Sequence, residues 1–238
     1  MRGGLLMKFC IVNADDFGAD IGINRGIAEA HTSGIVTSTS LMVNMPGTED
    51  AVELSRKLPG LGVGLHVNLT NEGGPTVVDL DDETACRVEI LNQLRRFRLM
   101  TGGLPTHLDA HHNIHRDARL RQIFVELARK YGLPLRESCQ VRYLSKFYGQ
   151  WDGETHLEQI AVDSLLGMLE TEVEPGFTEL SCHPGYMTEG NSSSYGMERE
   201  FELATLCDSR VRDRIEALGI TLISYRELPI LHTVGEAG

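Results

Sequence analysis

Short β-branched or alternating apolar runs recur along the chain, and most are followed by a turn and then by a helix-like pattern. These runs predict strands at residues 8–14, 36–44, 62–69, 106–110, 133–137, 178–182 and 221–225. Repeated alternation of strands and helices is typical of a parallel sheet, either doubly wound or closed into a barrel. The pattern therefore predicts an α/β fold.

The clearest helix is predicted at residues 117–131. Its apolar side chains recur at the i, i+3, i+4, i+7 spacing of one helix face, and they are Leu120, Ile123, Phe124, Leu127 and Tyr131. Basic residues occupy the last turn and Gly132 follows it, which is typical of a helix C-terminus. Residues 155–170 and 209–218 show the same kind of pattern and are also predicted to be helical.

The two faces of the strand predicted at residues 62–69 help to choose between the two kinds of sheet. One face is apolar, whereas the other carries Gly62, Gly64, His66 and Asn68. A central strand of a doubly wound sheet is apolar on both faces. A barrel strand can pack one face on the helices and turn polar residues toward the mouth. We therefore expect a (β/α) barrel.

Length and composition fit a single barrel domain. The chain has 238 residues, of which 41% are hydrophobic, and no Pro/Ser linker or repeat divides it. Residues 1–238 are predicted to form one domain, with residues 1–6 as a disordered leader before Met7. Because no run of 18 apolar residues occurs, no membrane-spanning segment is predicted.

Charge and cysteine usage narrow the possible partners and compartments. The formal net charge of −12 repels polyanions, so nucleic acid and anionic membranes are poor partners. The five cysteines are an odd number and have no C-x-x-C spacing. This usage favours reduced thiols in a cytoplasmic protein over a disulfide framework or a thiolate zinc site.

Four polar clusters lie at the C-terminal ends of four predicted strands, at residues 13–18, 66–68, 107–115 and 181–185. The βα loops of a barrel converge at that end of the strands, where barrel enzymes place their active sites. Four clusters at the same end are hard to explain by packing alone. We therefore expect them to form one active site.

Asp15 and Asp16 directly follow the first predicted strand. Such a pair could cap the next helix. Like charges in a crowded turn repel one another, however, unless a cation or a proton is shared. One carboxylate on a metal ion and the other free as a base would meet that requirement.

Histidines from two further strands extend the candidate site. His66 lies on the glycine-rich strand face, where a lone histidine more often bonds to a backbone carbonyl. His107, His111 and His115 could form a helical stripe, but the short segment between a proline and the next helix favours a strand end. A strand places His107, Asp109 and His111 on one face, with His111 nearest the mouth.

One aspartate together with His66 and His111 makes an Asp/His/His site for one divalent ion, with positions left for water and substrate. Water on such an ion ionises near pH ~7 and becomes a nucleophile. His183, from a fourth strand, would act as the general acid, although a histidine beside Pro184 could instead cap a turn. These residues predict a metal-dependent hydrolase.

These motifs resemble the YdjC-like carbohydrate deacetylases, the family that includes chitooligosaccharide (diacetylchitobiose) deacetylase. The resemblance covers nearly the whole chain and rests on residues 11–18 (IVNADDFG), 34–40 (GIVTSTS), 64–69 (GLHVNL), 106–112 (THLDAHH) and 182–184 (CHP). It implies a distorted (β/α) barrel related to the polysaccharide deacetylases, one divalent ion commonly assigned as magnesium, and often a homodimer.

The resemblance also implies roles for individual residues. It makes Asp16, His66 and His111 the metal ligands, Asp15 the catalytic base and His183 the acid.

Three more residues are expected near the ion, in contact with the substrate or behind the ligands: Asn68, Asp109 and Arg136. Arg136 matches a family arginine and is expected to orient the base or the substrate. An ion pair at the surface with the neighbouring Glu137 is an alternative for it.

The chain departs from the family pattern in two places. Family members often carry three consecutive histidines where this chain has His111, His112 and Asn113, so the third imidazole is not expected to be essential. The stretch from Thr70 to Thr84 is short compared with the insertion that larger members carry there. Since such loops often form a lid, the size of the substrate stays open.

The activity that the resemblance implies is metal-dependent hydrolysis of the N-acetyl group of an N-acetylated sugar or oligosaccharide, which yields acetate and a free amine. Ligand softness would suit Zn²⁺ or Co²⁺ better than the implied Mg²⁺. One alternative is a metal-dependent phosphoesterase on a similar barrel, which would require Lys or Arg near the ion. Another is a non-catalytic sugar-binding protein, but its decayed site should have lost at least one of the five residues.

Overall fold

In the part of the chain that the structure describes, seven strands form one parallel sheet in the order β4-β3-β2-β1-β8-β5, with β9 paired to β1. The computed structural model describes residues 7–71, 75–188 and 194–228, so the leader expected at residues 1–6 lies outside the described residues. The strands are β1 Lys8–Phe17, β2 Ser38–Leu41, β3 Gly62–Val67, β4 Leu108–Ala110, β5 Val141–Leu144, β8 Gly176–Cys182 and β9 Ile220–Leu222.

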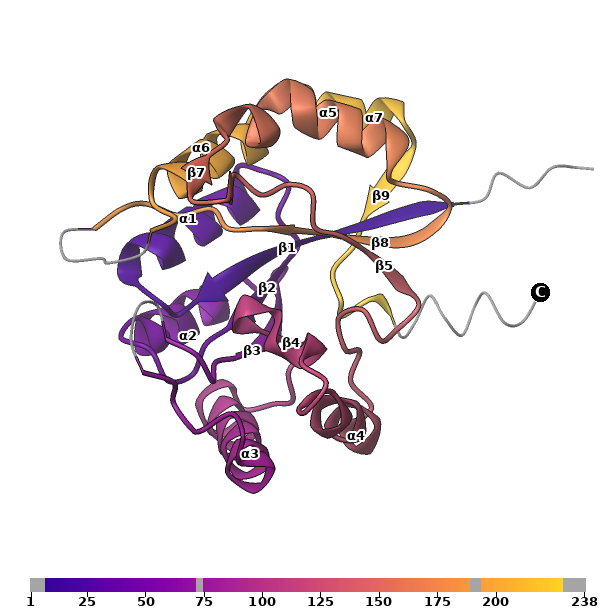
Figure 1. The fold of residues 1–238 in the computed structure, drawn as a ribbon. Helices are drawn as coiled ribbons and strands as arrows, with labels where there is room; N and C mark the ends of the chain where they lie inside the picture. Colours follow the sequence, from indigo (N-terminus) through magenta and orange to yellow (C-terminus); the bar gives the residue numbers. More distant parts are fainter. Residues whose placement is uncertain (1–6, 72–74, 189–193, 229–238) are drawn as a thin grey trace, which may run out of the picture.

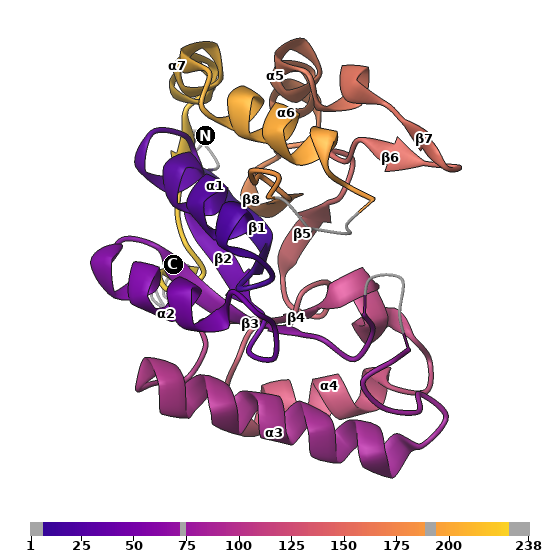
Figure 2. The same cartoon turned by 90° about the vertical axis from the view of Figure 1, so that its left-hand side faces the viewer.

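The long strand β1 is the centre of the sheet. It pairs with β8 from Lys8 to Ala14. Along its other edge, β9 pairs with the first residues of β1 and β2 pairs with the last, from Asn13 to Phe17. Two partners that diverge along one edge curl the sheet, and Figures 1 and 2 show the helices around the outside of this curl. The expected distorted (β/α) barrel is confirmed in the form of an incompletely closed, curled parallel sheet.

The helices are α1 Ile21–Thr32, α2 Thr48–Lys57, α3 Glu83–Thr101, α4 Arg121–Tyr131, α5 Val162–Thr171, α6 Met197–Leu206 and α7 Ser209–Ala217. Their apolar faces pack on the sheet in one large core, where Ile27, Leu94, Phe124 and Leu169 are at most 2% exposed. The predicted C-terminus at Gly132 is confirmed, because this glycine ends α4 in the left-handed conformation at φ 65°. Among the described residues, no helix combines the length and the apolar character that crossing a bilayer requires.

Two predicted elements differ from the structure. Residues 133–137 do not form a ladder strand, and Leu135 makes only a single bridge to Leu108. Pro134 has no N–H to donate and Glu137 has a φ of 59°, so pairing cannot continue on either side. The neighbour of β8 is instead β5.

The helix predicted at residues 155–170 is broken at Ala161, whose backbone is extended. It consists of the short 3₁₀ helix η2 Leu157–Ile160 and of α5. Before it lies a small hairpin that the hydrophobic pattern does not reveal, made of β6 Gln150–Trp151 and β7 Glu154–Thr155.

The glycine-rich face of β3 makes room for a buried ring. A Cβ at Gly64 would lie 2.3 Å from Cε1 of His107. The His107 ring is fully buried and stacks on Tyr225, with centroids 3.9 Å apart. Because this ring is packed on its far side, it has no space to retreat. Because Gly64 has no side chain, the His107 ring can fill the inside of the curled sheet.

This packing predicts that Gly64→Ala lowers the free energy of unfolding by about 1–3 kcal/mol, the usual cost of overpacking. Gly167→Ala is the matched control, because a Cβ at this position in α5 would have no atom within 4 Å. Alanine should stabilise that helix by about 0.5–1 kcal/mol. Urea unfolding of both variants measures the difference, and a Gly64→Ala variant as stable as the unmodified protein would contradict this account.

Candidate active site

A β-bulge at the end of β1 directs the side chains of two adjacent aspartates into the same cavity. Ala14 pairs with Thr39 and Phe17 pairs with Leu41, so Asp15 and Asp16 together lie opposite a single residue of β2. Adjacent side chains of a regular strand point to opposite faces, and a bulge changes that direction. Asp16 has a φ of 68°, a conformation that non-glycine residues rarely adopt. Both carboxylates line the same cavity.

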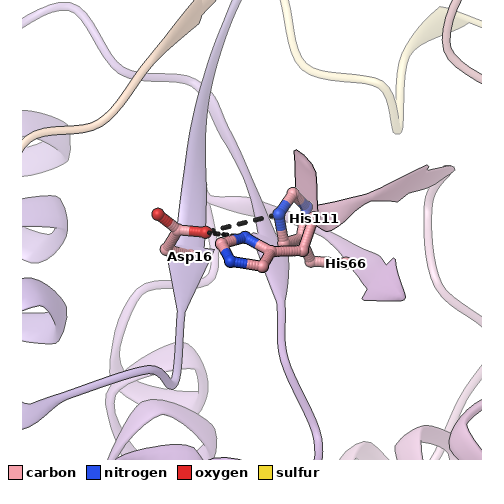
Figure 3. A group of neighbouring side chains, drawn as sticks. All are labelled: Asp16, His66 and His111. Carbon is pink, nitrogen blue, oxygen red and sulfur yellow. Dashed lines mark hydrogen bonds and ion pairs between the residues drawn. The ribbon is translucent and has the colours of Figure 1, made fainter. Parts of the chain in front are cut away.

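Asp16 is joined by two histidines from different segments of the chain (Figure 3). Its Oδ1 lies 3.0 Å from Nδ1 of His111 and 3.3 Å from Nε2 of His66. His66 lies on β3, and His111 opens the short 3₁₀ helix η1 His111–Arg116 that follows β4. All three side chains are buried, and their ligand atoms lie within 4.8 Å of one another. The structure therefore brings together the three residues expected to bind a metal.

The geometry of this cluster fits a divalent ion. Atoms that share one ion at about 2.0–2.2 Å lie roughly 3.0–3.5 Å apart, and both distances from Oδ1 of Asp16 to the histidine nitrogens fall in this range. His66 also donates from Nδ1 to Oδ1 of Asp109, at 2.8 Å, because a carboxylate can only accept. This bond leaves Nε2 facing Asp16, the arrangement usual for metal-binding histidines.

The buried charges around the cluster also favour a divalent cation. Four carboxylates are in contact with two guanidinium groups, which leaves two negative charges; these groups are Asp15, Asp16, Asp109, Glu179, Arg136 and Arg199. The pKa of His66 is raised to about 10, since burial lowers it but Asp109 and the other carboxylates outweigh burial. In the absence of a metal ion His66 carries an extra proton, so a metal ion must displace this proton in order to bind.

A second group of possible ligands, made of Asp15, His66 and Asp109, lies beside the first. Arg136 already occupies it, because its Nη2 lies 2.7 Å from Asp15 and 2.8 Å from Asp109. A guanidinium cannot give up its charge. The cluster around Asp16 is therefore the better cation site.

Arg136 controls the protonation state of Asp15. It donates two hydrogen bonds of 2.7 Å, one to each carboxylate oxygen, while it also bonds to Glu179. Burial raises the pKa of Asp15, but the charge of Arg136, its hydrogen bonds and the nearby His66 together outweigh burial and hold this pKa below its usual value. Asp15 therefore stays ionised at neutral pH.

Of the two alternatives for Arg136, the structure has the one directed at the aspartate. Its side chain is fully buried rather than at the surface. Glu137 pairs instead with Arg116, at 2.5 Å, and with His115, at 3.2 Å.

His183 lies across the cavity, at the end of β8. Its Nε2 is 3.9 Å from Oδ2 of Asp15, and its Nδ1 is 3.9 Å from Glu202. Burial outweighs the nearby aspartates and lowers the pKa of His183 to about 4. The ring is therefore neutral at neutral pH.

Two residues of α6 also belong to this site, although no sequence motif predicted them. Arg199 donates to Oδ2 of Asp16 at 2.6 Å, and Glu202 accepts from the backbone N–H of His183 at 2.5 Å. Burial raises the pKa of Glu202 to about 8, so it carries a proton at neutral pH. The one signal in the sequence is that these charged residues are three apart and so share a helix face.

Asn68 was expected to face the cavity, and this is wrong. Its side chain is buried and lies against Asn44 and Met45, and its backbone is held by Gln93. β3 ends at Val67, so the alternation of faces that would have turned Asn68 inward no longer applies.

Comparisons with known proteins show which proteins this chain resembles. Residues 10–217 match the family model described as YdjC-like protein. The carbohydrate deacetylase of Geobacillus stearothermophilus is 36% identical, over 92% of this chain and 98% of its own length. The carbohydrate deacetylase of Clostridium beijerinckii is 34% identical, over 92% and 99%.

Solved structures show the same fold. A protein of Enterococcus faecalis, proposed to take part in cellobiose-phosphate cleavage, superimposes with a TM-score of 0.80 at 29% identity, over 93% of this chain and 99% of that one. A family 4 carbohydrate esterase from Streptomyces lividans, in complex with acetate, has a TM-score of 0.58 at 15% identity, over 90% and 91%. The latter likeness concerns the fold alone.

Because the two aspartates have different surroundings, we predict that replacing one of them weakens metal binding whereas replacing the other does not. Asp16→Asn removes a carboxylate from the cation cluster and should weaken metal binding by more than about 100-fold, beyond the loss usual for residues that only support a ligand. Asp15→Asn is the matched control, and it should keep the metal because Arg136 faces that side chain. Metal content after dialysis measures both, and an empty Asp15→Asn site beside a filled Asp16→Asn site would reverse the assignment.

Proposed function

Since the chain belongs to the YdjC-like protein family, we propose that it hydrolyses the N-acetyl group of an N-acetylated sugar or oligosaccharide to acetate and a free amine. Relatives of 34% and 36% identity that align over nearly their full length are carbohydrate deacetylases. The observation that carries the proposal is the meeting of a cation cluster, an ionised aspartate and a histidine around one cavity of about 250 Å³.

Asp16, His66 and His111 would hold the divalent ion. When bound, such an ion acidifies water and polarises a carbonyl group. An Asp/His/His donor set favours zinc or cobalt over magnesium, which prefers oxygen ligands. We therefore propose zinc or cobalt as the ions to test first, with magnesium, which the family resemblance implies, beside them.

Asp15 is proposed as the general base. It takes a proton from the water that attacks the acetyl carbon. Its lowered pKa makes it a weak base, so the transfer requires water of increased acidity. Arg136 holds both oxygens of Asp15 and balances its charge, which makes Arg136 a positioning residue.

His183 is proposed to protonate the departing amine, a poor leaving group without a proton. Because the ring is neutral at neutral pH, it must first receive a proton. The proton that Asp15 takes from the water is the one that the reaction itself supplies, but the 3.9 Å between the two side chains is too long for a direct hydrogen bond. A water molecule or a substrate atom must therefore complete the transfer. In this proposal His183 therefore begins the cycle neutral and becomes the acid only after it has received that proton.

The two alternatives are less well supported. A phosphoesterase needs cationic side chains directed at its substrate, but Arg136 is enclosed by three carboxylates and Arg199 donates to Asp16. Asp15 and Asp16 on the cavity wall would repel a phosphate. A non-catalytic sugar-binding protein would not need to keep all five expected residues around one cavity.

The homodimer and the cytoplasmic location stay proposals. The family resemblance supports the dimer. Free thiols at all five cysteines support a reducing compartment.

The proposed reaction predicts that the protein releases acetate from N-acetylated sugars and that a chelator abolishes the release. Asp15→Asn keeps the size of the side chain but removes its basicity, so kcat should fall by roughly 10²–10⁴-fold while the metal is retained. Enzymatic quantification of acetate, with and without added Zn²⁺, measures this. Full activity in excess chelator would rule out the proposed role of the ion.

The proposed acid predicts a dependence on the leaving group. His183→Ala should lower kcat by about 10²–10⁴-fold on an N-acetyl sugar. The loss should be much smaller on an O-acetyl ester of a phenol, whose leaving group needs no proton. Acetate release from the two substrates measures the contrast, and equal losses on amide and ester would exclude His183 as the acid.

A further inference from the structure

Beside His183, two tyrosine rings form part of the cavity wall. Tyr148 and Tyr195 stack with their centroids 4.7 Å apart and their planes 3° from parallel. Both meet the His183 ring edge to face, with centroids 5.5 Å away in each case. All three side chains line the cavity. We call Tyr148 and Tyr195 the aromatic wall.

The aromatic wall is held in place from behind. The hydroxyl of Tyr195 donates to Glu202 and accepts from the backbone N–H of Gly149, at 2.8 Å. Tyr195 is 5% exposed, whereas Tyr148 is 37% exposed. Tyr148 therefore presents ring surface at the cavity while its position is fixed by its neighbours, and little conformational entropy is lost when a ligand binds there.

The chemistry of the proposed reaction decides which part of the substrate meets this wall. The acetyl carbonyl must face the cluster of Asp16, His66 and His111, and the amide nitrogen must come within reach of His183. That nitrogen is bonded directly to a carbon of the sugar ring. The ring therefore lies on the His183 side of the cavity, where the aromatic wall is.

The size and the surface of the cavity fit one ring. Its volume of about 250 Å³ lies just below the range of roughly 300–1,000 Å³ found for pockets that hold drug-sized ligands. One pyranose with its acetamido group is a ligand of that smaller size. The C–H groups on one face of a pyranose are weakly electropositive and pack well on the negative face of an aromatic ring.

We propose that Tyr148, supported by Tyr195, binds the pyranose ring that carries the acetamido group and so selects sugars over other N-acetylated amines. This inference rests on the proposed function and adds the residues that bind the ring, which the reaction itself does not identify. The remaining rings of an oligosaccharide then lie outside the cavity.

The test compares variants that keep or lose an aromatic ring at position 148. Tyr148→Leu should lower kcat/KM for N-acetylglucosamine by about 2- to 10-fold, mainly through KM, because the stacking contribution is lost. Tyr148→Phe should recover most of it. For N-acetylethanolamine, which has no sugar ring, the loss in Tyr148→Leu should be several-fold smaller. A Tyr148→Leu variant with an unaltered KM for the sugar, or with equal losses on both substrates, would overturn the proposal.

Trp151→Leu is the control for the loss of an aromatic ring elsewhere. Trp151 is 42% exposed on the β6–β7 hairpin, where it stacks on His156, and it does not line the cavity. Its variant should keep the kinetics of the unmodified protein on N-acetylglucosamine. An equal loss in Trp151→Leu would assign the effect to the hairpin and overturn the role of Tyr148.

Saturation-transfer NMR on chelator-treated protein separates this inference from the proposed function, because it detects sugar binding without hydrolysis. Ring protons of N-acetylglucosamine should receive saturation from the unmodified protein and from Tyr148→Phe, and less from Tyr148→Leu. If this pattern holds but no acetate is ever released, the proposed function is wrong and the subsite stands. If acetate is released but Tyr148→Leu transfers as much saturation as the unmodified protein, the subsite is wrong and the function stands.

Discussion

The need to neutralise four carboxylates in a small buried volume determines most of this site. Asp15, Asp109 and Glu179 surround the single guanidinium of Arg136. Removing one partner from such a buried network usually costs about 3–5 kcal/mol, because the remaining charges lose their compensation. Arg199 balances part of the charge of Asp16. The two remaining negative charges make a divalent cation the natural complement of the cluster, so the network that stabilises the interior also prepares it to hold an ion.

The bulge in β1 gives this network two functions. It directs the neighbouring side chains of Asp15 and Asp16 into the same cavity, and it requires a left-handed backbone conformation at Asp16. Asp15 then meets Arg136 while Asp16 meets two histidines, so two chemically identical residues have different surroundings. One is suited to accept a proton and the other to bind a cation. Strain that is tolerated at one residue thus separates two roles that a regular strand would have placed on opposite faces.

Local patterns predicted those parts of the molecule that depend on neighbours in sequence. The strand alternation follows from the hydrophobic pattern, the end of α4 follows from Gly132, and the meeting of Asp16, His66 and His111 follows from their places at strand ends. Arg199 could not be predicted in the same way, because its contact with Asp16 depends on how α6 packs over the mouth of the curled sheet. Asn68 was misplaced because periodicity does not reveal where a strand ends. The position of Arg199 therefore escaped prediction because it depends on tertiary packing, and that of Asn68 because it depends on a strand boundary.

The central claim is that one divalent ion completes the buried charge network at Asp16. Anomalous diffraction from crystals grown with Zn²⁺ tests it directly. The account predicts a single peak within about 2.0–2.3 Å of a carboxylate oxygen of Asp16 and of ring nitrogens of His66 and His111. A peak between Asp15 and Asp109, with Arg136 displaced, or the absence of any peak in the cavity would contradict it.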